Sequence, residues 1–319
     1  MKRAVEKNSK HKLKEIKQVA DRCSVLRKGK YIGTVEVKNT STKKMAEMMV
    51  GRPVSFEINK KEADPTDVVL EVQNITVSDH LSGKLRVNDV SFAVRKGEIL
   101  CVAGIEGNGQ TQLIEAITGL SKSTGSIMLN GEDISKTSIR QRNNLGVSHI
   151  PEDRHKHGLV LDYSLEYNLV LQEYFTSKFQ KFGFLNHKAI RENAEKKIIE
   201  YDIRSGQGPI TSARSMSGGN QQKAIIAREV SRDTDLIIAV QPTRGLDVGA
   251  IEFVHEQLIK MRDAGKAVLL ISLELDEVMN LSDRIVVMYE GELVGEFDPQ
   301  LTTETELGIY MAGSTRSEE

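Results

Sequence analysis

The sequence predicts an α/β protein built on a mainly parallel β-sheet that is covered by helices. Three observations predict this class. Short apolar runs of strand length alternate with longer helix-forming segments, a glycine-rich loop joins one apolar run to a helix, and the composition is that of a globular protein. The chain has 319 residues, of which 39% are hydrophobic and 28% charged, which suffices for one large domain and an appendage.

The elements follow from local patterns. Alternating apolar residues predict the first strand, and two later apolar runs are typical of buried parallel strands. A charged, helix-favouring stretch predicts a helical insertion between them. Strands are expected at residues 68–75, 98–103, 236–240 and 267–272, helices at 111–117, 186–201, 223–230 and 251–264, and a final strand and turn at 284–297.

Composition narrows the function classes. The net charge of −1 argues against a nucleic-acid partner, because such binders usually carry a basic excess. The two cysteines, Cys23 and Cys101, lie far apart and favour a reducing cytosol over a disulfide framework. Met1 leads into a lysine-rich stretch without the apolar core of a signal peptide. No apolar run reaches the roughly 18 residues that span a bilayer, so a membrane role is expected to need a partner.

An internal repeat organises the chain. His11 aligns with Leu273, and 273 minus 11 gives an offset of 262 that continues without a gap to Gly51 and Gly313. We therefore expect the tail of one copy, followed by a complete second copy. The expected parts are a truncated C-terminal remnant of a first copy at 1–52, a linker at 53–67, the second copy at 68–315 and a tail at 316–319. We expect residues 1–52 to have no sheet to join and to be poorly ordered.

A phosphate-binding loop is predicted directly after the strand at 98–103. The sequence GIEGNGQT at 104–111 fits the pattern G-x-x-x-x-G-K-[ST] at every position except the lysine, which is Gln110. Backbone donors and Thr111, a weak magnesium ligand, remain, so a nucleotide is expected to bind weakly. The alternative is a glycine turn without chemical function; a dinucleotide-binding loop is excluded because Gln112 replaces its third glycine. The expected nucleotide-binding residues are Gly104, Glu106, Gly107, Asn108, Gly109, Gln110, Thr111 and Gln112.

A second motif identifies a family. The sequence SGGNQQ at 217–222 opens a helix, an apolar strand follows, and PTRGLD stands at 242–247. This order resembles the ATP-binding cassette (ABC) family over residues 68 to about 313. The resemblance implies the P-loop fold of ABC ATPases, with an antiparallel β subdomain and a helical subdomain at about 155–232. It assigns the signature to Ser217, Gly218, Gly219, Asn220 and Gln221, the D-loop to Gly245, Leu246 and Asp247, and the Q-loop position to Glu152.

Together with the repeat, these motifs resemble the second cassette of tandem importers for simple sugars and nucleosides, with a lean towards nucleosides from residues 104–110. The resemblance implies ATP and Mg²⁺ as cofactors. Its implied partners are an intact first cassette, transmembrane permease subunits and, indirectly, a substrate-binding protein, with no nucleic acid. It also implies a cytoplasmic, peripheral location on the inner face of the membrane. In this family a signature completes the nucleotide site of the partner cassette in trans.

Departures from the family decide the predicted chemistry. Hydrolysing members have Asp then Glu after the second buried strand, where this chain has Val240 and Gln241. Valine cannot hold the magnesium shell, and an amide cannot accept a proton as a general base. Leu273 replaces the switch histidine, and no Tyr or Phe lies at 78–88 to stack on adenine. With Gln110, these positions leave no catalytic set in cis. Drift and a selected regulatory site both account for the losses.

Other functions stay open at this point. The chain could be a nucleotide-binding regulatory or interaction module that hydrolyses nothing, or a non-functional truncated remnant. A soluble ABC ATPase acting on ribosomes or DNA is disfavoured, because such proteins keep both catalytic sets and this chain has Gln110 and Val240. The repeat aligns His11 with the switch position, so His11 could be the switch histidine of the first copy. The simpler interpretation is that His11 is a solvated histidine in a basic stretch. The cargo is not encoded here, because specificity lies in the permease and binding protein.

Overall fold

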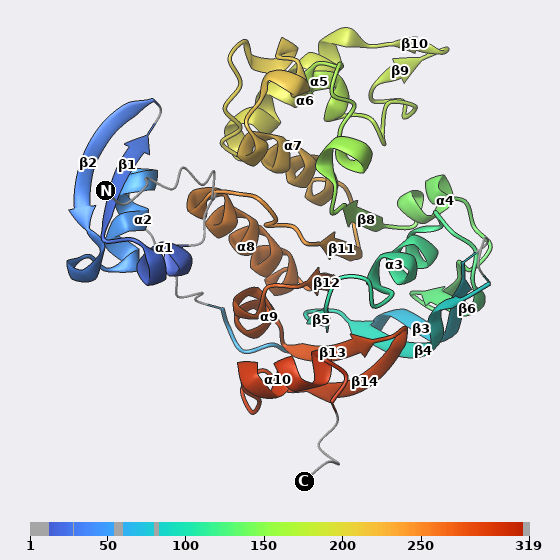
Figure 1. Ribbon diagram of the computed structural model, residues 1–319. Coiled ribbons are helices and arrows are strands. Elements are labelled where there is room, and N and C mark those ends of the chain that lie inside the picture. Colours follow the sequence, from blue (N-terminus) through green and yellow to red (C-terminus); the bar gives the residue numbers. More distant parts are fainter. Residues whose placement is uncertain (1–12, 28, 54–59, 80–82, 315–319) are drawn as a thin grey trace. The chain divides into compact units, whose positions relative to one another are not determined.

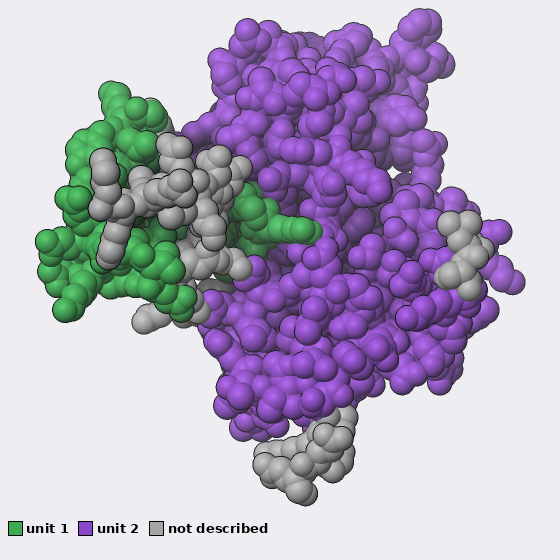
Figure 2. Space-filling model, in the orientation of Figure 1, with its two compact units in different colours: residues 1–59, 243–256 green, residues 60–242, 257–319 purple. Residues whose placement is uncertain are grey.

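The computed structural model describes residues 13–27, 29–53, 60–79 and 83–314, the side chains of residues 14 and 15 excepted. His11 lies outside the described residues. The chain forms two compact units, one made of residues 1–59 and 243–256 and the other of residues 60–242 and 257–319. Figure 2 shows them in different colours.

The smaller unit packs two helices on a two-stranded antiparallel sheet (Figure 1). Its elements are α1 Leu13–Val19, β1 Arg22–Arg27, β2 Lys30–Glu36, α2 Thr42–Val50 and the start of α8 Val248–Asp263. Leu13, Met45, Ala46 and Val248 form its buried core. The hydroxyl of Ser41 caps α2 by accepting from the backbone N–H of Lys44. The expectation that this segment is poorly ordered is wrong for residues 13–27 and 29–53. Their strands β1 and β2 form a sheet of their own, and their apolar side chains share a small core with Val248 of α8.

The same order of elements recurs 262 residues further on. The recurring elements are α9 Leu275–Leu281, β13 Arg284–Tyr289, β14 Glu292–Phe297 and α10 Glu304–Met311. Even the irregularity recurs, because the register shifts after Val25 in the first pair of strands and after Val287 in the second. The difference lies in the pairing: β1 pairs with β2 in a separate sheet, whereas β13 joins the large sheet.

The larger unit contains a six-stranded sheet in the order β14-β13-β5-β12-β11-β8. Its strands are parallel except for β14, which pairs antiparallel at one edge. The strands not yet given are β5 Ile99–Ala103, β8 Val147–Ile150, β11 Leu236–Val240 and β12 Ala267–Ser272. Every residue of β5, β11 and β12 is buried, which explains their unbroken apolar runs: both faces of these strands are covered.

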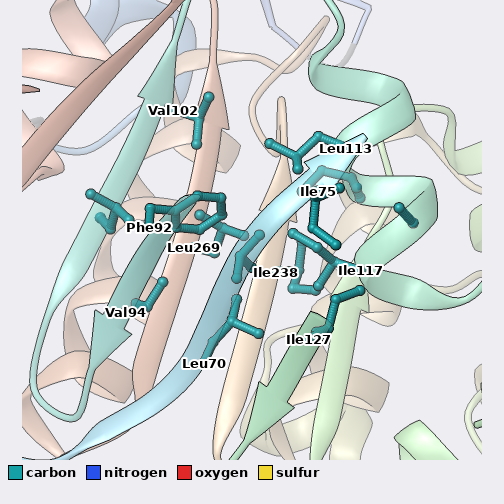
Figure 3. Close-up of a cluster of buried hydrophobic side chains, with 14 of the residues drawn as sticks. Leu70, Ile75, Phe92, Val94, Val102, Leu113, Ile117, Ile127, Ile238 and Leu269 are labelled. Atoms are coloured by element: carbon teal, nitrogen blue, oxygen red, sulfur yellow. The ribbon is translucent and has the colours of Figure 1, made fainter. Parts of the chain in front are cut away.

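A four-stranded antiparallel sheet, β4-β3-β6-β7, forms the second layer of this unit. Its strands are β3 Val68–Ser78, β4 Leu85–Arg95, β6 Thr124–Leu129 and β7 Glu132–Asp133, and α3 Gln110–Thr118 and α4 Ile139–Asn144 accompany them. One apolar cluster joins both sheets to α3, as the side chains of Leu113, Ile117, Ile127, Ile238 and Leu269 in Figure 3 show. The P-loop helix is therefore fixed between two sheets.

A helical lobe completes the larger unit (Figure 1). It comprises α5 Leu165–Asn168, α6 His187–Glu200, α7 Gly218–Val230 and a hairpin of β9 Gln180–Lys181 and β10 Phe184–Leu185. The predicted fold class is confirmed, since the mainly parallel sheet, the antiparallel sheet and the helices are all present. No helix within the described ranges is long and apolar enough to cross a membrane.

The segment expected as a linker, residues 53–67, has no helix or strand in its described part. It is nevertheless held against the larger unit. The ammonium of Lys60 lies 2.9 Å from a carboxylate oxygen of Asp283, and the Arg262 guanidinium donates to the carbonyl of Lys61. Arg262 itself is almost fully buried and also pairs with Asp283. The half-buried Lys60 is thus paired with Asp283, and the backbone of the exposed Lys61 is held by the buried Arg262.

Candidate functional site

The glycine loop at 104–109 lies between the buried strand β5 and helix α3, as predicted. Its geometry demands glycine. Gly107 and Gly109 have φ values of 97° and 105°, in the left-handed region. A Cβ on Gly109 would lie 2.2 Å from the carbonyl oxygen of Arg86, so the loop approaches the β3–β4 hairpin backbone too closely for any side chain. A second support comes from Asn108, whose side-chain oxygen accepts from the backbone N–H of Glu290.

The side chain of Gln110 folds back into this loop. It is 5% exposed, and its amide nitrogen donates to the carbonyl oxygen of Ile105 at 3.2 Å. A Cβ on Gly104 would lie 2.3 Å from that nitrogen, so the amide fills the space beside the first glycine of the loop. A neutral amide donor therefore occupies the position inside the loop where the general pattern has the cation of a lysine.

The loop still fits an anion. Gly109 is the N-cap of α3, and no side chain caps the helix, so the first N–H groups remain available to a phosphate. Thr111, in the first turn, is exposed, as is Glu106, whereas Gln112 is half-buried. Backbone donors, the helix N-terminus and the Thr111 hydroxyl are the groups that would hold the phosphates of a nucleotide.

The end of strand β11, where Val240 and Gln241 lie, does not fit a magnesium site. Val240 is 5% exposed and belongs to the apolar cluster that also contains Leu113 and Met288. Gln241 follows with φ 43°, a left-handed conformation that is strained for a residue other than glycine. Its backbone N–H donates to Ile271 at 2.7 Å, which keeps the loop on the sheet. Among the residues that the structure describes, no group of three His, Cys, Asp or Glu could hold a metal ion.

Leu273, the residue at the expected switch position, directly follows strand β12 and is half-buried. The hydroxyl of the preceding residue, Ser272, accepts from the backbone N–H of Glu274 at 3.2 Å. This bond shapes the turn into α9 but involves no group of Leu273 that could exchange a proton. The structure therefore places an aliphatic side chain at this position.

The signature residues open helix α7. Ser217 is the N-cap, yet its hydroxyl makes no capping bond and instead accepts from the Asn220 amide at 2.8 Å. Gln221 is buried, donates to the carbonyl of Ala213 and shares a 2.9 Å bond with the His155 ring. The N–H groups at the start of this 13-residue helix are therefore free of side-chain caps, which is the arrangement that binds anions.

The segment that follows the half-buried Glu152 is braced against the signature helix. The carboxylate of Asp153 accepts from the N–H groups of His155 and Lys156, which lowers the pKa of this carboxyl and starts a π-helical turn at Arg154–Gly158. A Cβ on Gly218 would lie 3.0 Å from the Arg154 guanidinium, so this arginine packs on the first signature glycine. The resemblance placed residues 146–154 at the Q-loop position, with Glu152 in place of the glutamine; only the fold reveals that Arg154 and His155 contact the signature.

The D-loop residues lie in the smaller unit. Gly245 has φ 69°, Leu246 is buried, and the carboxylate of Asp247 accepts from the N–H of Ala250 at 2.9 Å, which caps α8. Within the larger unit, the glycine loop and the signature stand on separate helices, α3 beside the sheets and α7 in the helical lobe (Figure 1).

Comparison with known proteins assigns the class. A family model described as "ABC transporter" matches residues 87–244, a range that includes the glycine loop, the signature and part of the PTRGLD segment. The chain therefore contains an ATPase domain of the ABC transporter family. An ATP-binding cassette of an ABC transporter in its ADP conformation superposes with a TM-score of 0.61 at 21% identity, covering 77% of this chain and 96% of that one. A nucleotide-free cassette gives 0.62, again at 21% identity, with 73% and 92% covered, which confirms the P-loop fold of ABC ATPases.

Relatives with assigned functions are similar over nearly the whole chain. The guanosine import ATP-binding protein NupO of Bacillus subtilis (strain 168) is 53% identical, covering 94% of this chain and 59% of the relative. The nucleoside import ATP-binding protein NupA of Lactococcus lactis subsp. cremoris is 51% identical, with 97% and 61% covered. The ribose import ATP-binding protein RbsA of Clostridium tetani is 39% identical, with 94% and 58% covered. The chain thus spans about three-fifths of the length of these relatives.

Proposed function

We propose that this chain is the non-hydrolysing cassette of an ABC importer ATPase, and that its signature completes the ATP site of an intact partner cassette. One observation carries the proposal. A complete signature opens α7 with N–H groups free of side-chain caps, in a chain whose own strand end has Val240 packed into the core. The helix N-terminus favours the charge of a phosphate group presented from outside the chain.

The chain's own site is proposed to hold a nucleotide weakly and not to hydrolyse it. The backbone of the loop at 104–109 and Thr111 would hold the phosphates, while Gln110 supplies a neutral donor. In an active cassette, a magnesium ion neutralises the charge that develops on the transferred phosphoryl group. Val240 and Gln241 offer neither a carboxylate ligand nor a base, so we derive no hydrolytic step through this site.

A tandem origin is supported by the repeat. The elements α1 to α2 reproduce α9 to α10 at an offset of 262 residues, and the relatives extend well beyond the region that this chain matches. On this proposal, residues 1–52 are the C-terminal remnant of a first cassette, 53–67 a linker and 68–315 the second cassette. The intact first cassette is then a partner, in the same full-length protein or in a second polypeptide.

The further partners follow from the same family. We infer transmembrane permease subunits as the docking site, with a substrate-binding protein acting indirectly, and a cytoplasmic, peripheral location at the membrane. Nucleosides are the proposed cargo class, because the relatives described as guanosine and nucleoside importers are 53% and 51% identical, against 39% for the ribose importer. ATP and Mg²⁺ are the proposed cofactors of the assembled pair.

The test combines this chain with an intact cassette. The part of the Bacillus relative that this chain does not match, extended to include the stretch that aligns with residues 1–52, supplies the intact cassette as a separate polypeptide, and steady-state MgATP hydrolysis is measured for each protein and for the mixture. We expect a rate at background for this chain alone and a clear rise on mixing. Ser217→Arg, which places a bulky side chain at the N-cap of α7, should abolish the rise. Ser215→Arg is the matched control, because Ser215 is exposed and lies two residues earlier in a 3₁₀ turn.

The outcomes separate the competing functions. A mixture that hydrolyses ATP no faster than its components, although this chain binds ATP, would favour a regulatory or interaction module. Absence of both hydrolysis and ATP binding would favour a non-functional remnant. If Ser215→Arg reduced the rate as strongly as Ser217→Arg, the signature would have no specific role.

A further inference from the structure

A small hairpin projects from the helical lobe and carries exposed aromatic residues at its tip. Strands β9 and β10 pair Lys181 with Phe184 and Gln180 with Leu185, leaving Phe182 and Gly183 as a two-residue turn. Figure 1 shows the hairpin extending away from the helices of the lobe. None of the nucleotide chemistry described above uses it.

The base of the hairpin is firmly anchored. The ring of Phe179 is fully buried in a small apolar cluster with Val170 and Ile190. The side chain of Gln180 crosses the hairpin, because its amide donates to the carbonyl of Phe175 and its oxygen accepts from the N–H of Gly183. The tip is therefore held in a defined conformation by its own base.

At the tip, two phenylalanine rings face solvent. Phe182 is 89% exposed and Phe184 is 80% exposed. Phe182 also has φ 53°, a left-handed conformation that a bulky residue adopts at a cost, where Asn or Gly would be the ordinary choice. An aromatic residue that is both strained and exposed indicates a selected contact rather than a packing role.

The charged residues along this stretch of the chain are of one sign. Lys178 and Lys181 are exposed, and their ammonium groups lie 4.7 Å and 5.6 Å from the ring centroids of Phe179 and Phe182. No Asp or Glu occurs from residue 174 to residue 191. This local excess of positive charge stands out in a chain whose net charge is −1.

We propose that this hairpin, residues 178–185, inserts its aromatic tip into the interface of an anionic lipid bilayer. Aromatic rings settle at the level of the lipid headgroups, and lysines beside them are attracted to anionic lipids. The size of the tip favours lipid over a protein partner. Two phenylalanines bury about 150–250 Å² each, well below the roughly 800 Å² per partner of a stable protein interface. The contact would orient the helical lobe towards the membrane.

Vesicle co-sedimentation of the full chain, without nucleotide, tests the proposal. Vesicles of phosphatidylcholine with phosphatidylglycerol are compared with vesicles of phosphatidylcholine alone. We expect binding to the anionic vesicles that falls at least about tenfold in Phe182→Ser/Phe184→Ser, because each ring loses its apolar transfer into lipid. The double variant Lys178→Glu/Lys181→Glu should show a similar fall in binding to the anionic vesicles. Its remaining vesicle binding should depend less on salt concentration than that of the unmodified chain.

Ile199→Ser provides the matched control, because Ile199 is 81% exposed on α6 of the same lobe but lies outside the hairpin. Its vesicle binding should equal that of the unmodified chain. Unchanged far-ultraviolet circular dichroism would show that each variant folds. The proposal is overturned if the chain binds no vesicles or if the phenylalanine variant binds vesicles as well as the control does. It is also overturned if the phenylalanine variant loses only its binding to permease subunits in detergent. Any of these results leaves the hydrolysis experiment with the partner cassette unaffected.

Discussion

Replacing Gln110 with lysine tests whether the missing cation weakens nucleotide binding at the chain's own site. The amide of Gln110 lies inside the glycine loop and bonds to Ile105 at 3.2 Å, so the new ammonium group would begin from a position beside the phosphate cradle. The substitution restores the lysine of the general pattern and alters no residue of the strand end at Val240.

The expected gain follows from the change in hydrogen-bond type. A neutral hydrogen bond contributes about 0.5–1.5 kcal/mol net, whereas a bond to a charged group contributes about 1.5–3 kcal/mol. The difference between the midpoints of these ranges, roughly 1.25 kcal/mol, corresponds to about eightfold tighter binding. Hydrolysis should stay at background, because Val240 and Gln241 still provide no magnesium ligand and no base.

Titration calorimetry with MgATP measures this change, and a coupled phosphate assay measures hydrolysis. Gln300→Lys is the control, because it adds the same charge at an exposed position outside the glycine loop and the signature and should change the affinity less than about threefold. Equal affinity for the Gln110→Lys variant and the unmodified chain would refute the role assigned to the missing cation. Turnover by the variant would refute the role assigned to the strand end.

Three further predictions concern the larger unit. Glu229→Ala should lower the free energy of unfolding by about 3–5 kcal/mol in urea titrations, because the fully buried Glu229 pairs with the guanidinium of Arg228 and would leave it uncompensated; a loss below about 1 kcal/mol would contradict this. Burial lowers the pKa of His149 from 6.5 to about 4, so the unfolded state binds the proton first and stability should fall by up to about 3 kcal/mol as the pH drops from 6.5 to 4. His149→Gln should flatten that slope, and an unchanged slope would assign it to other groups. Phe179→Ala should cost about 3–5 kcal/mol by leaving a cavity under the hairpin, and hydrogen exchange should show opening confined to the helical lobe.

Much of the fold could be predicted because its strands and turns carry strong local signals. The apolar runs of β11 and β12 coincide with the predicted strands, since strands buried on both faces admit no polar residue. The glycine loop was located by its pattern, and positive φ angles at Gly107 and Gly109 explain why glycine occurs there. The ABC class followed from the order of several motifs rather than from any one of them.

What escaped prediction depends on contacts between distant segments. Nothing local in the sequence places Arg154 on Gly218 or the ring of His155 on Gln221, because these pairs meet only when α7 packs against the turn after β8. The hairpin was also missed. Its strands have two residues each, too short for a periodic pattern, and its aromatic tip is exposed where periodicity would place such residues in the core. The roles assigned to Gln110, Val240 and the signature remain predictions.

The central claim is that hydrolysis in the assembled pair takes place at the partner's site, with this chain contributing its signature. The most direct measurement is MgATP hydrolysis by a mixture in which the partner cassette carries glutamine in place of its catalytic glutamate and this chain is unmodified. The account predicts a rate at background, because Val240 and Gln241 leave no second hydrolytic site in the pair. A rate that persists, and that disappears when Gln241 is replaced by alanine, would show that this chain hydrolyses ATP itself and would contradict the account.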